Sequence, residues 1–61
     1  MKRRDLIQHI KDHGCFLDRD GAHHSIYRNP ARGWCAPVPR HREIKETTAR
    51  TICDQLVIPR R

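Results

Sequence analysis

The sequence has few aromatic residues, no Cys-x-x-Cys pair and no long apolar segment. One Phe, one Trp and one Tyr make up 5% of its 61 residues, and apolar residues are 36%. A chain of this size buries only about 60% of the surface that its unfolded form exposes, which leaves little room for a cofactor pocket. No apolar run approaches the roughly 18 residues of a membrane span, and the first residues lack the apolar stretch of a secretory signal. We expect one domain over residues 1–61, without a membrane segment or a small-molecule cofactor.

Cysteine and histidine give weak support for a metal site. The chain has three cysteines, namely Cys15, Cys35 and Cys53. An odd number without a secretory signal is typical of reduced thiols, which predicts a cytoplasmic protein with small, buried cysteines. Asp5, His9 and His13 share one side of a predicted helix and could bind a metal ion weakly. Because such a polar stripe is the ordinary solvent-facing side of a helix, no metal site is predicted.

Positive charge is in excess. Thirteen Lys and Arg against seven Asp and Glu give a formal net charge of +6, and only three of the thirteen are lysines. The planar guanidinium of arginine suits bidentate contact with phosphate. Such an excess on a short chain favours a polyanionic partner, either a nucleic acid or an acidic protein, over a merely solvated surface.

Apolar residues at helical spacing predict two helices. A stripe of one leucine and two isoleucines lies on one side of a helix over residues 3–13, and Gly14 is suited to end it. A second stripe, with apolar residues at i, i+3, i+4 and i+7, predicts a helix over residues 46–56. Thr47 or Thr48 is the expected cap at its start.

Three short segments between the helices are predicted strands. They span residues 15–19, 23–28 and 34–38, with an Asp-Gly hairpin turn at 20–21. Residues 59–61 are expected to form a loose tail. Short connections favour an antiparallel three-stranded sheet with both helices on one face, an α+β fold. This α-β-β-β-α order is that of a double-stranded-RNA-binding domain.

Two adjacent histidines are the best candidates for chemistry. An imidazole of ordinary pKa, about 6.5, both accepts and donates a proton near neutral pH. Such a group could take the proton of an RNA 2′-hydroxyl or protonate the leaving oxygen, while arginines stabilise the phosphorane charge. Neighbouring strand residues point to opposite faces, so at most one of His23 and His24 serves a given site. Alternation groups His24 with Ile26 and His23 with Tyr27, and it does not decide which of these faces the core. Two polar strand residues without catalytic function are the alternative.

Five short motifs follow one another along nearly the whole chain. They are Gly-Cys-Phe at 14–16, Asp-Gly-Ala-His-His at 20–24, Tyr-Arg-Asn-Pro at 27–30, Pro-Val-Pro-Arg-His at 37–41 and Glu-Ile-Lys-Glu at 43–46. This ordered set resembles the HicA toxins, ribosome-independent mRNA interferases of HicA–HicB toxin–antitoxin systems. The resemblance implies an endoribonuclease that needs no metal and acts through one histidine as general acid/base. It also implies mRNA as substrate, a HicB-like antitoxin that covers the site, and a place in growth arrest under stress.

The resemblance selects one of the two histidines. The catalytic histidine of the family follows a Gly-Ser pair, and here Ala22 stands in the place of the serine. Counting back from the Tyr-Arg run selects His24, whereas counting forward from Gly21 selects His23. We predict His24 as the catalytic residue, with His23 as second choice. The missing hydroxyl removes a group that could orient the imidazole or a phosphate.

Basic residues elsewhere are predicted to bind RNA. Arg28 shares the strand parity of His24, Arg40 and His41 follow the third strand, and the first helix begins with basic residues. The predicted RNA-binding residues are Arg28, Arg40, His41, Lys2, Arg3 and Arg4. Trp34 is predicted to be structural, with base stacking as the alternative, and Tyr27 is predicted to pack in the core. The competing hypotheses for the whole chain are a non-catalytic RNA-binding module and a small zinc-binding interaction domain.

Overall fold

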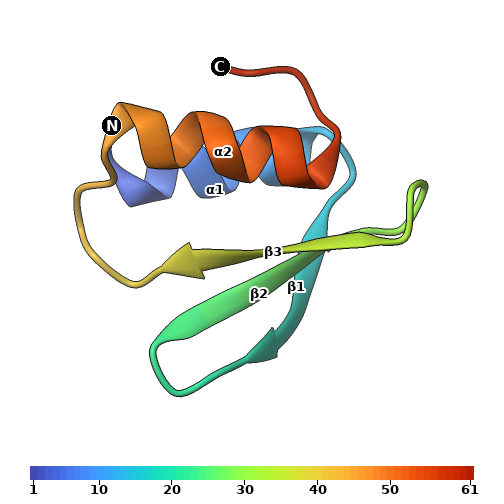
Figure 1. Cartoon of the computed structure of the whole chain (residues 1–61), viewed down its shortest axis with the longest axis horizontal. Helices are drawn as coiled ribbons and strands as arrows, with labels where there is room; N and C mark the ends of the chain where they lie inside the picture. Colours follow the sequence, from blue (N-terminus) through green and yellow to red (C-terminus); the bar gives the residue numbers. More distant parts are fainter.

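Three strands form one antiparallel sheet, and two helices cover one of its faces in the computed structural model, which describes residues 1–61 (Figure 1). The elements are α1 (Arg3–Asp12), β1 (Phe16–Asp20), β2 (His24–Asn29), β3 (Trp34–Pro39) and α2 (Glu46–Leu56). The sheet order is β1-β2-β3, so β2 is central and both other strands are edges. The predicted α-β-β-β-α fold, like that of a double-stranded-RNA-binding domain, is confirmed. None of its helices is both long and apolar enough to pass through a membrane.

Alternating burial along β2 shows which side of the sheet faces the helices. Ser25, Tyr27 and Asn29 are buried, whereas His24 and Arg28 are exposed. The core between the helices and the sheet consists of Leu6, Ile10, Cys15, Tyr27, Ala36, Val38, Ile44, Ala49, Ile52, Cys53, Leu56 and Ile58. Tyr27 is therefore a packing residue, as predicted. The other side of the sheet, which no helix covers and which carries His24 and Arg28, is called the open face below.

The ends of the helices follow the sequence in one case and depart from it in the other. Gly14 follows the last turn of α1 with a φ of +83°, a conformation that glycine adopts without steric cost, as predicted. At the start of α2, extended Lys45 takes the N-cap position and no side chain caps the helix. The predicted Thr47 or Thr48 cap is wrong because both threonines already lie within the first helical turn.

Two side chains that were expected inside the molecule lie outside it. Cys15 and Cys53 are buried, and desolvation raises the pKa of both thiols. Cys35 is exposed because its register opposite Arg28 places it on the open face. Trp34 has 60% of its surface exposed, so the prediction of a structural tryptophan is wrong. It is the first residue of the edge strand β3, and its indole lines an open groove beside the end of α2.

Contacts between distant segments hold both chain ends against the body. The Met1 ammonium donates a hydrogen bond to the Ile44 carbonyl at 3.0 Å, and the Ile44 N–H donates to the Met1 carbonyl at 2.7 Å. In the 59–61 segment the Arg60 guanidinium pairs with both Asp54 carboxylate oxygens, at 3.0 and 2.7 Å. The first contact fixes the connection after β3 beside the start of α1, which shapes the surface described next.

Candidate nucleic-acid interface

Most of the predicted site residues lie at one end of the molecule. The turn between β1 and β2, the end of β3, the connection into α2 and the N-terminus meet there (Figure 1). Three contacts tie them together. His24 pairs with Pro39 across the sheet, and the Arg3 side chain donates to the Pro39 carbonyl at 2.8 Å. The backbone of Lys2 forms an isolated antiparallel β-bridge with that of Glu43. The residues gathered here are Lys2, Arg3, Arg4, His23, His24, Arg40 and His41. Arg28 lies farther along β2.

The two histidines sit on a short turn, residues 21–24, called the histidine loop. The Gly21 N–H donates a hydrogen bond to the His24 carbonyl at 2.8 Å, which closes the turn. A Cβ at position 21 would approach the same carbonyl oxygen to 3.2 Å, so glycine is needed here for space rather than for φ. Both imidazoles are exposed. Because β2 begins at His24, its side chain lies on the open face with those of Ile26 and Arg28.

The Arg40 guanidinium holds the histidine loop from outside. Its Nη1 donates to the Ala22 carbonyl at 3.2 Å, and its Nη2 donates to the His24 carbonyl at 3.1 Å and to the Gly21 carbonyl. Its Nε reaches the Ser25 hydroxyl at 3.3 Å. The planar fork of arginine is suited to joining several acceptors at once. Arg40 therefore positions the loop, and much of its hydrogen-bonding capacity is used within the protein.

A charged network lies directly beneath the histidine loop. The buried Ser25 hydroxyl donates to Asp20 Oδ1 at 2.9 Å and accepts from Arg3 Nη2 at 3.1 Å. The hydrogen bond from Ser25, with one from Arg40, lowers the pKa of the Asp20 carboxyl from its ordinary value of 3.8. The Asp20 carboxylate also forms a 3.3 Å ion pair with Arg40.

Four cationic side chains line a cleft at the start of α1, called the basic cleft. They are Lys2, Arg3, Arg4 and Arg42. The Arg3 N–H donates to the Arg42 carbonyl at 2.9 Å, which brings the last of them to the other three. Cations beside a helix N-terminus oppose the helix dipole, and an anion bound between them would relieve that repulsion. No carboxylate lines the cleft, and a phosphate group fits its chemistry. Arg42 was not among the predicted residues, because it joins the cleft only through this long-range backbone contact.

Arg28 lies on the open face, apart from the end that holds the histidine loop. It pairs with Phe16 on β1 and with Cys35 on β3. It is four positions from His24 along β2, which is about 13 Å in a strand. His41 is exposed on the connection after β3, close to the basic cleft.

The other two histidines face the protein's own backbone. His9 Nε2 lies 2.6 Å from the Pro59 carbonyl, and His13 Nδ1 lies 2.9 Å from the His9 carbonyl. No group of three or more His, Cys, Asp or Glu side chains is arranged so that it could hold a metal ion. In the stripe of Asp5, His9 and His13, the first two residues contact the C-terminal segment and His13 contacts the helix backbone.

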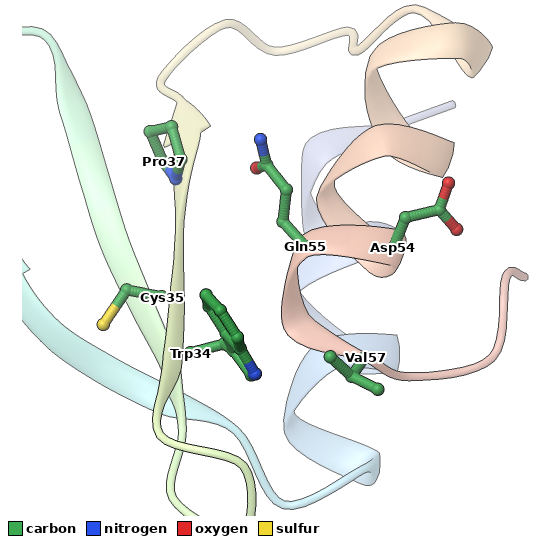
Figure 2. Close-up of a pocket in the computed structure, with 6 residues that line it drawn as sticks. All are labelled: Trp34, Cys35, Pro37, Asp54, Gln55 and Val57. Carbon is green, nitrogen blue, oxygen red and sulfur yellow. The ribbon is translucent and has the colours of Figure 1, made fainter.

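A groove with an exposed tryptophan lies at the other end of the molecule. Figure 2 shows Trp34 and Val57 side by side between β3 and the end of α2, with Gln55 above them. Asp54 at its margin is already paired with Arg60. Because Trp34 begins β3 and His24 pairs with the last residue of that strand, the groove is separate from the histidine loop.

Comparison with known proteins assigns a family to this geometry. A family model described as the HicA toxin of bacterial toxin–antitoxin systems matches residues 3–58, nearly the whole chain. The chain belongs to the HicA toxin family. Searches of curated proteins and of solved structures found no match. Membership makes the chain a toxin of a toxin–antitoxin system and implies an antitoxin partner of some kind.

Proposed function

We propose that this HicA-family chain is a cytoplasmic, ribosome-independent mRNA interferase that uses His24 as general acid/base. The observation that carries the proposal is the placement of His24. Its imidazole is exposed on a loop whose carbonyls are hydrogen-bonded to Arg40, at the end of the molecule that also carries the basic cleft. A phosphodiester that reacts at His24 thus has the positive charge of Arg40 nearby, and the hydrogen-bonded loop reduces the orientational freedom that the imidazole must lose for cleavage.

The reaction needs only groups present in RNA, protein and water. The His24 imidazole takes the proton of a ribose 2′-hydroxyl as that oxygen attacks the neighbouring phosphorus. The bond from phosphorus to the 5′ oxygen breaks and that oxygen takes a proton from water, while the His24 imidazolium gives its proton back to the hydroxide left behind. The products are a 2′,3′-cyclic phosphate and a free 5′-hydroxyl. The Arg40 guanidinium, which contacts the His24 carbonyl, stabilises the added negative charge of the phosphorane, and no metal ion takes part.

Phosphates away from the reacting bond would bind the basic cleft. Lys2, Arg4 and Arg42 offer cationic groups without a carboxylate partner in the cleft, whereas Arg3 spends donors on Pro39 and Ser25. The same positive surface complements an acidic inhibitor. We propose that the antitoxin is a HicB-like protein, as the family implies, and that it covers this end of the molecule.

The chemistry of the products tests the proposal. The purified chain is incubated in EDTA with a labelled RNA, and the ends of the fragments are determined. We expect 2′,3′-cyclic phosphate ends, and no cleavage at a position where a single 2′-deoxy sugar replaces the ribose. Fragments with 3′-hydroxyl ends, or cleavage at the deoxy position, would contradict the mechanism. If the chain binds the RNA and leaves it intact, a non-catalytic RNA-binding module is the better account.

A further inference from the structure

A second RNA contact lies on the open face, away from the histidine loop. We propose that Phe16 stacks on a base of single-stranded RNA while Arg28 binds the adjacent backbone phosphate. The inference rests on the proposed function, since RNA is the ligand. It assigns Phe16 a role that the sequence did not suggest, and it places the RNA contact predicted for Arg28 at a nucleotide other than the reacting one.

The register of the strands places the two side chains together. Phe16 pairs with Arg28 across β1 and β2, and directly opposed residues of an antiparallel pair share one face with Cβ atoms about 5 Å apart. Arg28 is exposed on the open face, so Phe16 lies there too, with 45% of its surface exposed. An aromatic ring beside a guanidinium, on a face that no helix covers, can receive a base and its phosphate together.

Charge on the open face favours a polyanion. A bulge at position 18 shifts the register so that Arg19 pairs with Ile26 and joins the same face. Neither Arg19 nor Arg28 takes part in an ion pair, and no carboxylate occupies a paired position on this face. His24 stands at the end of this face, on the same side of the same strand as Arg28. A strand of RNA with its reacting bond at His24 can therefore continue along the face toward Phe16.

The distance along β2 separates the two contacts. Arg28 is four residues from His24, about 13 Å along the strand, and strand side chains stand roughly perpendicular to the sheet, so the two are placed to contact different phosphates. The Phe16 and Arg28 pair thus belongs to a nucleotide beyond the scissile bond. Its loss should weaken RNA binding and leave the rate of the bound complex nearly unchanged.

Neighbouring Leu17 provides a matched control for Phe16. It is 44% exposed, nearly the same as Phe16, but it pairs with buried Tyr27 and so lies on the other face of the sheet. The probe is a fluorescent single-stranded RNA with 2′-O-methyl groups on every sugar, which cannot be cleaved by the proposed mechanism. Its dissociation constant is measured by anisotropy for the wild type and for the variants Phe16→Ala, Phe16→Trp, Leu17→Ala, Arg28→Gln and Trp34→Ala, with circular dichroism to confirm folding.

We expect Phe16→Ala to weaken binding about 5- to 150-fold, the range for loss of one base–aromatic stack. Phe16→Trp should retain most of the affinity, and Leu17→Ala should change it less than twofold. Arg28→Gln should reduce the slope of log affinity against log salt by about 0.7, the value for one phosphate contact on a single strand. In a set of RNAs that each lack one base, the effect of Phe16→Ala should vanish at one position.

Three outcomes would overturn the inference. Equal effects of Phe16→Ala and Leu17→Ala would mean that exposed apolar area, not stacking, matters. Loss of affinity in Trp34→Ala but not in Phe16→Ala would place the RNA in the groove beside α2. In both cases the wild type still binds RNA, so the proposed function survives. If the wild type binds no RNA, the proposed function and this inference fail together.

Discussion

Replacing Arg40 with Gln should separate catalysis from folding. The variant loses donors to the carbonyls of Gly21, Ala22 and His24 and to the Asp20 carboxylate. These acceptors belong to exposed residues, so water replaces much of what is lost, and buried Ser25 keeps its bond from Arg3. At roughly 0.5 kcal/mol for each exposed bond, we expect the free energy of unfolding to fall by about 1–2 kcal/mol.

The effect on cleavage should be larger than the effect on stability. A domain of this size has about 3–9 kcal/mol of stability, so the variant remains folded. Without Arg40 the histidine loop is free to shift, and a displacement of about 1 Å in a reacting group costs about 100-fold in rate. We predict this loss in single-turnover cleavage at saturating protein, with little change in RNA affinity.

Two further variants check the reasoning on Arg40. Arg40→Lys keeps the charge but not the planar fork, and it should lose a similar part of the rate. Arg50→Gln removes an exposed arginine from α2 that makes no side-chain hydrogen bond, and it should behave as the wild type. A normal cleavage rate in Arg40→Gln would refute the positioning role. A rate restored fully by lysine would show that charge alone matters.

Three smaller predictions concern stability and reactivity. Leu6→Ala removes a fully buried side chain and should cost about 2–5 kcal/mol in urea unfolding, whereas loss of exposed Leu17 should cost about 0.5 kcal/mol or less. A thiol reagent at neutral pH should modify exposed Cys35 rapidly and the other two cysteines only in denaturant, because burial raises their pKa. Rapid modification of all three cysteines in the folded protein would contradict the burial of Cys15 and Cys53. Folding lowers the Asp20 pKa, so its carboxylate stabilises the fold above pH 3.8 and the benefit is lost as pH falls through the lowered value. The gap in urea midpoint between wild type and Asp20→Asn should therefore close in acid, and a gap that widens there would refute the network.

Much of the fold could be predicted from the apolar pattern, because each helix has a single buried stripe. The helix expected over residues 46–56 has these bounds in the structure, and the first ends one residue early at Asp12. The first strand begins one residue later than predicted, because the Cys15 N–H donates to the Ile10 carbonyl and so belongs to the end of α1. The bulge at position 18 has no local sequence signal.

The faces of β2 could not be predicted, because each carries one large apolar residue. Packing against the helices decides the question: Tyr27 is buried and Ile26 is half-buried on the open face. His24 therefore lies outside the core and is accessible to RNA, as the role implied by the resemblance requires. Trp34 was predicted to be structural because tryptophan is usually buried, but it is the first residue of an edge strand and is largely exposed.

The roles of the arginines could not be separated without the fold. Arg40 was predicted to contact RNA, and the structure shows its guanidinium bound to the histidine loop 16 to 19 residues earlier in the chain. Arg42 reaches the basic cleft through a backbone contact with Arg3. Such long-range contacts leave no trace in local spacing, whereas composition alone indicated a polyanionic partner.

The most direct test of the account compares His24→Ala with His23→Ala in single-turnover RNA cleavage in EDTA. Both side chains are exposed, so both variants should fold as the wild type does. We predict that His24→Ala loses at least about 100-fold in rate, the contribution of a general acid/base, and that His23→Ala stays within a few-fold of the wild type. Full activity in His24→Ala, with or without loss in His23→Ala, would contradict the assignment of the catalytic residue.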